Sequence, residues 1–433
     1  MKRLLPLLFC LPLMPAALAA ETPAEHVVMA YGLMPEPGKP AFRLSAVQAK
    51  QLTHLNMAFL TLNAKGECIT ETALSAKDLK AQQSAWQEAR RNNPSLRILL
   101  SVGGWAHSND DSPEAAFFRQ AAATEEGRRR FAQSCMRMVR QFGLQGLDID
   151  WEYPRPEDSL NFAKLLRAVR TEMERLPAQD MPSYQITIAV PGSAFGLSRI
   201  YTHLRDIAQQ ADYLQLMTYD LHGPWDQQTH HQAHLFAEKD EALFHHPLRA
   251  LAPAGLSDTE KDRLYPPMFA MTIDAAVQQY RTGGVPARKL VMGIPFYGRA
   301  FFQTGSANRG LFQSFVTQAG DHYTGPKNLL PGCVSCERSG DPRIPDYADL
   351  VNLLNSRQGY EAHFSDHSQA SWVWHPERRV FITYDSAQVV QRKMRYIREQ
   401  GLAGAMAWQL GGDHPQHSLL QIMSQELMQK AHP

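Results

Sequence analysis

The chain has 433 residues, of which 44% are hydrophobic and 20% are charged, and its formal net charge is +1. This composition is typical of a globular protein with a sizeable core, and it excludes collagen-like and intrinsically disordered chains. A charge so close to zero provides no bulk attraction for nucleic acid, so we expect no nucleic-acid partner.

The first 20 residues have the three parts of a secretory signal peptide. Lys2 and Arg3 form a basic start, an apolar run follows, and Ala17 and Ala19 fit a small-residue cleavage site. Three prolines in the run disfavour a buried first helix. We expect residues 1–20 to be removed and the mature protein to be secreted, to the periplasm or the extracellular space. No later run is apolar enough to span a bilayer, so no membrane association is expected after cleavage.

Eight short apolar runs follow and alternate with amphipathic helical segments. The predicted strands are His26–Tyr31, His54–Phe59, Arg97–Gly103, Gly146–Glu152, Gln185–Val190, Asp212–Tyr219, Lys289–Pro295 and Ala403–Leu410. The predicted helices include 128–142, 159–175, 197–210, 273–281 and 386–400. This alternation indicates a parallel sheet covered on both sides, and eight strands are typical of a closed (β/α)8 TIM barrel of the α/β class. The alternative is an open doubly wound sheet, but no glycine-rich phosphate turn follows the first strand.

Two intervals are too long for simple connections. Residues 221–269 follow the sixth strand and are rich in His, Pro and polar residues. Residues 299–374 follow the seventh strand and have strand and helix patterns of their own, which predict a small α+β insertion between strand 7 and strand 8. We therefore expect the barrel to comprise residues 21–298 and 375–433. Both intervals follow C-terminal strand ends, where barrels build active sites.

The cysteines of an exported protein suggest disulfides. Cys333 and Cys336 have the spacing of a zinc half-site, a redox pair or a short-loop disulfide, and no second pair completes a zinc site. We therefore favour the disulfide. Cys135 lies in a helical stretch and is expected to be buried, and its pairing with Cys68 stays open.

The stretch "LQGLDIDWEYP" places Asp148, Asp150 and Glu152 at alternate positions of an apolar strand. Alternate residues share a face, so the three carboxyl groups point into the barrel together, while Ile149 and Trp151 pack outward. Like charges in a buried place raise pKa values, and a carboxyl group kept protonated in this way can protonate a leaving group. A merely solvated acidic strand end is the alternative, which the cost of burying charge disfavours.

Other strand ends carry side chains suited to a sugar. Met217 and Tyr219 alternate at the end of the sixth strand, Asp220 follows them, and Trp408 lies on the eighth. Aromatic rings around an acidic pocket suit the C–H faces of a sugar ring. Each ring alone is explained by core packing, but their convergence at one barrel mouth favours a carbohydrate site.

Five stretches resemble the motif set of the glycoside hydrolase family 18 chitinases. They are "LLSVGGW", "LDIDWEYP", "LMTYDLHGPWD", "MGIPFYGRAF" and "GAMAWQL", in the expected order. The resemblance implies a secreted chitinase that hydrolyses β-1,4 bonds between N-acetylglucosamine units of chitin or chito-oligosaccharides. It implies no cofactor and no metal, and we expect a monomer. The insertion resembles the α+β domain of deep-cleft bacterial chitinases.

The resemblance also implies a substrate-assisted retaining mechanism. Glu152 would protonate the glycosidic oxygen and later act as a base toward water, while the substrate's 2-acetamido oxygen attacks the anomeric carbon. Asp150 would orient the acetamido group, Asp148 would lie below it, and Tyr219 would hydrogen-bond it. The implied substrate-binding residues are Tyr31, Phe59, Gly104, Trp105, Tyr153, Met217, Asp220, Tyr297, Arg299 and Trp408.

One position departs from the family pattern, because Gln145 stands where a further aspartate precedes the acidic triplet. It falls on the outward register near the base of the strand, so we expect a structural role. Trp372 and Trp374 of the insertion are candidate sugar contacts, with core packing expected for at least one of them.

Three histidines of the polar interval, His230, His231 and His234, raise the question of a metal. No acidic residue is spaced for joint coordination, and the implied chemistry needs no metal. We therefore interpret them as solvated loop residues.

Two other functions stay open beside the chitinase. Lectins on the same scaffold typically lose the glutamate, whereas Glu152 is present. Endo-β-N-acetylglucosaminidases that act on glycoprotein glycans tend to lack "GIPFYGRAF" together with the α+β insertion, and both features are expected in this chain. The sequence thus favours a chitin-cleaving enzyme.

Overall fold

Eight parallel strands close into a barrel in the computed structural model. The structure describes residues 26–70, 74–176, 183–193, 197, 201–238, 255–257, 260, 271–316, 325 and 328–428. The barrel strands are β1 (Val27–Leu33), β2 (His54–Leu62), β4 (Arg97–Gly103), β5 (Gly146–Asp150), β6 (Gln185–Pro191), β7 (Tyr213–Met217), β8 (Leu290–Pro295) and β13 (Gly404–Trp408). They pair in this order, and β13 pairs with β1 to close the ring, which confirms the TIM barrel. The expected signal peptide lies outside the described residues.

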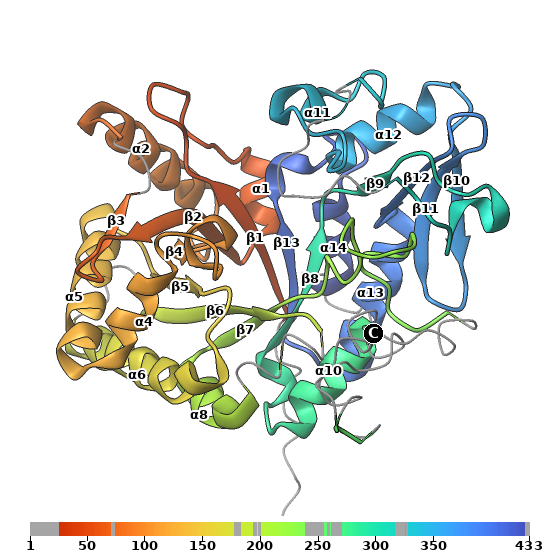
Figure 1. Cartoon of the computed structure of the whole chain (residues 1–433). Helices are drawn as coiled ribbons and strands as arrows, with labels where there is room; N and C mark the ends of the chain where they lie inside the picture. Colours follow the sequence, from red (N-terminus) through yellow and green to blue (C-terminus); the bar gives the residue numbers. More distant parts are fainter. Residues whose placement is uncertain are drawn as a thin grey trace, which may run out of the picture.

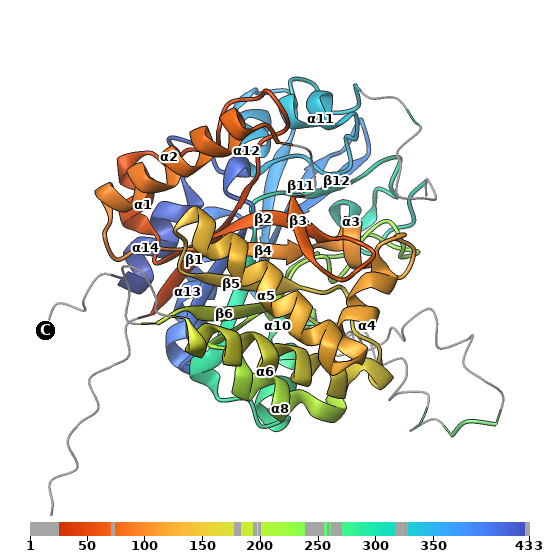
Figure 2. The same ribbon diagram turned by 90° about the vertical axis from the view of Figure 1, so that its left-hand side faces the viewer.

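Helices cover the outside of the barrel (Figures 1 and 2). They are α1 (Ala46–Gln51), α2 (Ala76–Asn92), α4 (Ala115–Ala123), α5 (Glu125–Phe142), α6 (Ser159–Arg175), α8 (Leu204–Gln210), α10 (Ile273–Thr282), α13 (Ala387–Gln400) and α14 (Leu419–Met428). In Figure 2, α5 lies beside α6, and α6 beside α8, over the strands behind them. No helix in the described ranges is both long enough and apolar enough to cross a bilayer.

Helix α5 illustrates how the sequence sets these elements. The side chain of Thr124 accepts the N–H of Gly127 at the start, and two glutamates occupy the first turn, where the helix dipole favours negative charge. Gly143 ends the helix in the left-handed conformation, with φ of 70°, which glycine adopts without steric cost. The buried face includes Phe131 and Val139, so the helix packs its apolar stripe onto the barrel.

The outward residues of β5 behave as their alternation predicts. Ile149 and Trp151 both belong to the core between the barrel and its helices. The ring of Trp151 stacks on Phe118 of α4 at 5.4 Å between centroids and meets Phe162 of α6 edge-on at 5.5 Å. Their neighbours in the acidic triplet are thereby directed to the opposite face, into the barrel.

Several predicted elements differ from the structure in their limits. The strand expected to reach Glu152 ends at Asp150, because pairing with β6 stops at Ile149. The helix expected at 197–210 is described as a 3-10 turn at Tyr201–His203 followed by α8, and residues 198–200 lie outside the described ranges.

A second, antiparallel sheet lies between β8 and β13 in the chain. Its strands are β9 (Arg299–Phe301), β10 (Glu361–Ser365), β11 (Ala370–His375) and β12 (Val380–Tyr384), in the order β10-β11-β12-β9. With α11 (Val334–Ser339) and α12 (Tyr347–Asn355) it stands to one side of the barrel (Figure 1). The sheet continues past the boundary expected at Trp374, because β12 pairs with both β11 and β9.

The two tryptophans of this insertion have core positions. Trp372 and Trp374 are buried in one cluster with Phe301, Leu311 and Phe381. Core packing therefore accounts for both of these candidate sugar contacts.

The four cysteines of the described chain form two disulfides. Cys333 pairs with Cys336 at the start of α11, which confirms the favoured interpretation. Cys68 pairs with Cys135, so the short strand β3 (Cys68–Thr70), which is antiparallel to β2, is linked to helix α5. The sequence left this second pairing open.

The longer disulfide is predicted to contribute more to stability. The Cys68–Cys135 bridge closes a loop with a sequence separation of 67, against 3 for the other bridge. In the chain-entropy model the bridge that closes the long loop is the more stabilising, by about 3 kcal/mol. We expect the double variant Cys68→Ala/Cys135→Ala to lower the urea midpoint of unfolding clearly more than Cys333→Ala/Cys336→Ala. An equal or reversed order of the two midpoints would contradict this.

Candidate active site

Asp148 lies at the base of the acidic triplet and is fully buried. Its Oδ2 accepts hydrogen bonds from Tyr31 Oη at 2.7 Å and Ser101 Oγ at 2.6 Å. Its Oδ1 accepts from Thr187 Oγ1 at 2.5 Å and Gln215 Nε2 at 2.7 Å. Burial raises the pKa of Asp148, and these hydrogen bonds oppose the rise. The carboxyl group is therefore held in one orientation by four different strands.

Asp150 sits one step higher on the same strand, between two other carboxyl groups. Its side chain is buried, and Oδ1 has no hydrogen-bond partner within the described residues. Burial, followed by the charges of Glu152 and Asp148, raises its pKa well above the ordinary range. A buried carboxyl oxygen without a partner costs stability unless a ligand supplies one. Oδ1 of Asp150 is therefore a candidate contact for a ligand.

Glu152 lies at the mouth, just beyond the end of β5. Burial raises its pKa to about 7, the charge of Asp220 adds to the rise, and a hydrogen bond from Tyr153 opposes it. Its backbone N–H donates to Ser108 Oγ at 2.9 Å, and that hydroxyl oxygen lies 3.1 Å from the carbonyl oxygen of Asp150. Glu152 can therefore carry a proton near neutral pH from a fixed position.

Two glycines at the end of β4 let that strand approach Asp150. Gly103 has φ of 113°, and a Cβ added there would lie 2.1 Å from the Asp150 carbonyl oxygen. The N–H of Gly104 donates to the same oxygen at 2.8 Å, and a Cβ on Gly104 would meet the ring of Phe59 at 2.6 Å. Neither position leaves room for a side chain, which explains the glycine pair in "SVGGW".

Aromatic rings form one wall beside the carboxyl groups. Trp408, at the end of β13, stacks on Phe59 with centroids 5.8 Å apart and meets Tyr31 edge-on at 5.1 Å. Tyr219 and Tyr297 contact each other edge-on at 6.2 Å. These rings and Met217 form a single cluster inside the barrel mouth. Burial and then the charges of Asp150 and Glu152 raise the pKa of Tyr219, so its hydroxyl group stays protonated beside them.

An ion pair between Asp220 and Arg299 links the barrel to the insertion. Oδ1 of Asp220 accepts hydrogen bonds from Arg299 Nε at 2.6 Å and from Tyr297 Oη at 2.7 Å. The guanidinium of Arg299, whose pKa the charge of Asp220 raises, also lies 4.9 Å from the ring centre of Trp225. Trp225 is 58% exposed, so it presents an open aromatic face next to this ion pair.

The residues expected to act together are thus brought to one end of the barrel. Trp105 follows the glycine pair and is 55% exposed, and Tyr153 hydrogen-bonds Glu152.

The sequence alone assigned no role to Thr187, Ser108 or Trp225. The sequence did contain a signal for Thr187, because it is the polar residue that faces inward in the fifth predicted strand, "QITIAV".

Gln145 has the structural role expected from its register. Its side-chain Oε1 accepts the N–H of Ile98 at 3.0 Å, and its Nε2 donates to the carbonyl of Gly143 at 2.8 Å. It fastens the start of β5 to β4, away from the three carboxyl groups.

The interpretation of His230, His231 and His234 as solvated loop residues is wrong. All three are buried, with exposed fractions of 3%, 0% and 0%. The insertion covers their loop: the N–H of Leu235 donates to the Ser368 carbonyl at 3.0 Å, and the ring of His231 lies 5.5 Å from that of Trp372, between centroids. Burial by a segment so far away in the chain cannot be predicted from the local composition.

The geometry defines a class of enzyme. A carboxyl group whose pKa is raised to about 7 stands above a second buried carboxyl group, beside an aromatic wall suited to sugar rings. A TIM barrel with this arrangement at the C-terminal ends of its strands is that of a glycoside hydrolase.

Comparison with known proteins identifies the family. The model for glycosyl hydrolases family 18 matches residues 31–413. Chitinase B of Serratia marcescens is 40% identical over 386 residues, which cover 88% of this chain and 77% of that protein. Chitinase A1 of Niallia circulans is 31% identical over 334 residues, which cover 75% of this chain and 42% of that protein.

The solved structures agree with this assignment. The structure of a family 18 N-acetylglucosaminidase from Paenibacillus barengoltzii has a TM-score of 0.71 at 29% identity, covering 93% of this chain and 100% of that one. The chain belongs to glycoside hydrolase family 18, and the resemblance of its motifs is confirmed.

The raised pKa of Glu152 predicts a pH-dependent stability. The folded protein binds this proton more tightly than an unfolded chain, whose value is near 4.5. The stabilisation is therefore complete below pH 4.5 and is lost as the pH rises through about 7. From pH 4.5 to 7 we expect the free energy of unfolding of the wild type to fall relative to Glu152→Gln, measured by urea unfolding.

The matched control is Glu174→Gln, which changes an exposed glutamate of α6. It should follow the wild type at every pH. Parallel curves for the wild type and Glu152→Gln would contradict the raised pKa.

Proposed function

We propose that the mature protein hydrolyses β-1,4 bonds between N-acetylglucosamine units of chitin or chito-oligosaccharides. The observation that carries the proposal is the column of carboxyl groups, in which Glu152, with its pKa raised to about 7, stands above an oxygen of Asp150 that has no partner among the described residues. Two relatives named chitinases, at 40% and 31% identity, support the choice of substrate.

The first chemical step is assigned to Glu152. Its carboxyl proton is transferred to the glycosidic oxygen as the bond to the anomeric carbon breaks. A pKa of about 7 keeps the acid loaded below neutral pH, and Tyr153 and the backbone contact to Ser108 keep it in place. After the leaving sugar departs, the carboxylate takes a proton from the attacking water.

The nucleophile is assigned to the substrate. The carbonyl oxygen of the 2-acetamido group attacks the anomeric carbon, which gives an oxazolinium ion and retention after hydrolysis. Asp150 Oδ1, which lacks a protein partner in the described chain, is placed to accept the acetamido N–H and to stabilise the developing positive charge. The hydroxyl of Tyr219, beside Asp150, is assigned to the acetamido oxygen.

Asp148 acts through Asp150 in this scheme. Its four hydrogen bonds fix its position, and its charge raises the pKa of the carboxyl group above it. The remaining residues bind the sugar. Trp408 forms the floor, with Tyr31, Phe59, Gly104, Trp105, Met217, Asp220, Tyr297 and Arg299 around the cleft.

The domain and cellular assignments follow from the sequence. We assign residues 1–20 to a signal peptide, residues 21–298 and 375–433 to the catalytic barrel, and residues 299–374 to the insertion, whose sheet extends to Tyr384. The mature enzyme is assigned to the periplasm or the extracellular space and acts as a monomer without a cofactor.

The role of Glu152 predicts a loss of turnover without a loss of binding. Wild type should release reducing ends from chitin oligomers, and Glu152→Gln should lower kcat by at least about 10³, because Glu152 is the acid assigned to the leaving oxygen. Glu157→Gln, an exposed glutamate nearby, is the control and should keep wild-type activity.

Other outcomes of this assay point to other functions. A wild type that binds chitin oligomers and releases no reducing ends would be a lectin. Cleavage of high-mannose glycans in preference to chitin oligomers would instead identify an endo-β-N-acetylglucosaminidase.

The role of Asp150 predicts a different separation of effects. Asp150→Asn keeps the size of the side chain but cannot become negatively charged as positive charge develops on the substrate, so kcat should fall by about 10²–10³ while the Kd for a chitin oligomer changes little. Isothermal titration and initial rates measure the two quantities. Turnover near the wild-type value would refute the assignment.

A further inference from the structure

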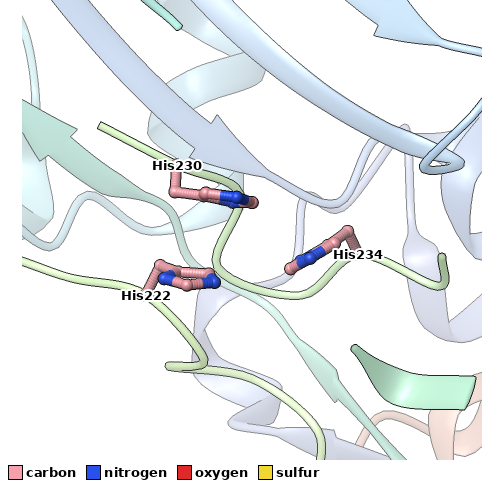
Figure 3. Close-up of side chains that lie close together, drawn as sticks. All are labelled: His222, His230 and His234. Atoms are coloured by element: carbon pink, nitrogen blue, oxygen red, sulfur yellow. The ribbon is translucent and has the colours of Figure 1, made fainter. Parts of the chain in front are cut away.

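Three buried histidines lie together in the loop after β7, outside the proposed catalytic set (Figure 3). His222, His230 and His234 each offer a ring nitrogen within 4.8 Å of the others. The rings of His222 and His230 stack with centroids 3.9 Å apart, and His234 lies 4.9 Å from His230. Their exposed fractions are 1%, 3% and 0%. Three imidazoles with this burial and spacing form a potential ligand set for a metal ion.

His222 is oriented as metal-binding histidines are. Its Nδ1 lies 3.1 Å from Oδ2 of Asp226, and that oxygen also accepts the N–H of Gly223 at 2.9 Å. A carboxylate that takes the proton on Nδ1 leaves the lone pair of Nε2 available to a metal. Nε2 of His222 is buried and has no hydrogen-bond partner within the described residues. This atom is an independent indication of a ligand, because a buried polar atom without a partner is costly.

We propose that His222, His230 and His234 bind one divalent transition-metal ion, with Zn²⁺ as the expected ion. Imidazole nitrogen is a good ligand for Zn²⁺, Cu²⁺, Ni²⁺ and Co²⁺, and three histidines with one water complete a tetrahedral zinc site. The carboxylate of Asp226 behind His222 adds negative charge that partly offsets the charge of the ion.

Binding requires the rings to approach one another and to turn. In a tetrahedral site, two nitrogens at about 2.0–2.1 Å from zinc lie about 3.3–3.4 Å apart. Each lone pair lies in the plane of its ring, so the stacked rings of His222 and His230, which are 22° from parallel, must rotate to point at one ion. The N–H of His231 donates to Nδ1 of His230 at 2.7 Å, which places the proton of neutral His230 on Nε2. A metal bound at Nε2 requires that proton to move to Nδ1, so the hydrogen bond from the His231 N–H to Nδ1 is lost when the ion binds.

The position of the site suggests a structural role in the cleft wall. The loop begins beside Asp220 and carries Trp225, which packs over Arg299. Farther along, the N–H of Thr229 donates to the carbonyl of Gln313 at 2.9 Å, and the N–H of Gln232 donates to Thr383 Oγ1 at 3.0 Å. An ion held by histidines from two sides of the loop would fix the wall between the barrel and the insertion.

The test uses the mature protein without a histidine tag, stripped with a chelator and then dialysed against Zn²⁺. We expect about one zinc per chain by elemental analysis, a rise in Tm with added Zn²⁺, and a visible absorption band on substitution with Co²⁺. His222→Ala and His234→Ala should abolish the stoichiometric zinc, the Tm rise and the cobalt band.

His203→Ala is the matched control, because His203 lies on the surface beside Asp206 and outside the cluster. It should keep all three signals. Asp226→Asn keeps the three rings and removes the carboxylate behind His222. It is the variant to test if the histidine variants do not fold. It should weaken zinc binding about 10–100-fold.

Two results would overturn the proposal. One is a wild type that retains no zinc after dialysis and shows neither a Tm rise nor a cobalt band. The other is binding in His222→Ala and His234→Ala equal to that of the wild type. Because the readouts are metal content, Tm and absorption, they are independent of whether the protein cleaves chitin.

Discussion

Four hydrogen bonds to one buried carboxyl group organise the interior of this barrel. Tyr31, Ser101, Thr187 and Gln215 come from β1, β4, β6 and β7, and all four donate to Asp148 on β5. A buried carboxyl group is expensive, and saturation with donors is what makes it tolerable. These bonds hold five strands in one register at that level. The strand geometry then places Asp150 and Glu152 above Asp148 at fixed intervals.

The arrangement of the carboxyl groups at the barrel mouth depends on the fixed position of Asp148. Asp150 and Glu152 both have raised pKa values, with burial as the first cause and neighbouring charges as the second. The two carboxyl groups differ in their partners: Glu152 is held by Tyr153 and Ser108, whereas Oδ1 of Asp150 has no partner in the described chain. In the proposed mechanism, Glu152 delivers a proton and Asp150 receives part of the substrate. Gly103 and Gly104 permit this by letting β4 pass against the backbone of Asp150.

The sequence predicted the structure correctly where the two-residue alternation of side chains along a strand decides which way they point. The alternation of Asp148, Ile149 and Asp150 predicted both the inward column and the outward core, because a strand has a period of two whatever surrounds it. It failed where distant segments meet. The polar composition around His230 suggested solvent, yet the insertion covers that loop, and the Cys68–Cys135 pairing depends on β3 lying against α5. Such contacts are set by tertiary structure, which local composition does not encode.

In the proposed mechanism the substrate supplies the nucleophile while Glu152 supplies the proton. The most direct measurement compares two chito-oligosaccharides of equal length that differ in the N-acetyl group of the sugar bound at the cleavage site. With the acetamido group present, the account predicts rapid hydrolysis and a product of retained anomeric configuration, followed by NMR. With a free amine in its place, cleavage at that bond should be undetectable. Comparable rates for the two substrates, or an inverted product, would contradict the account.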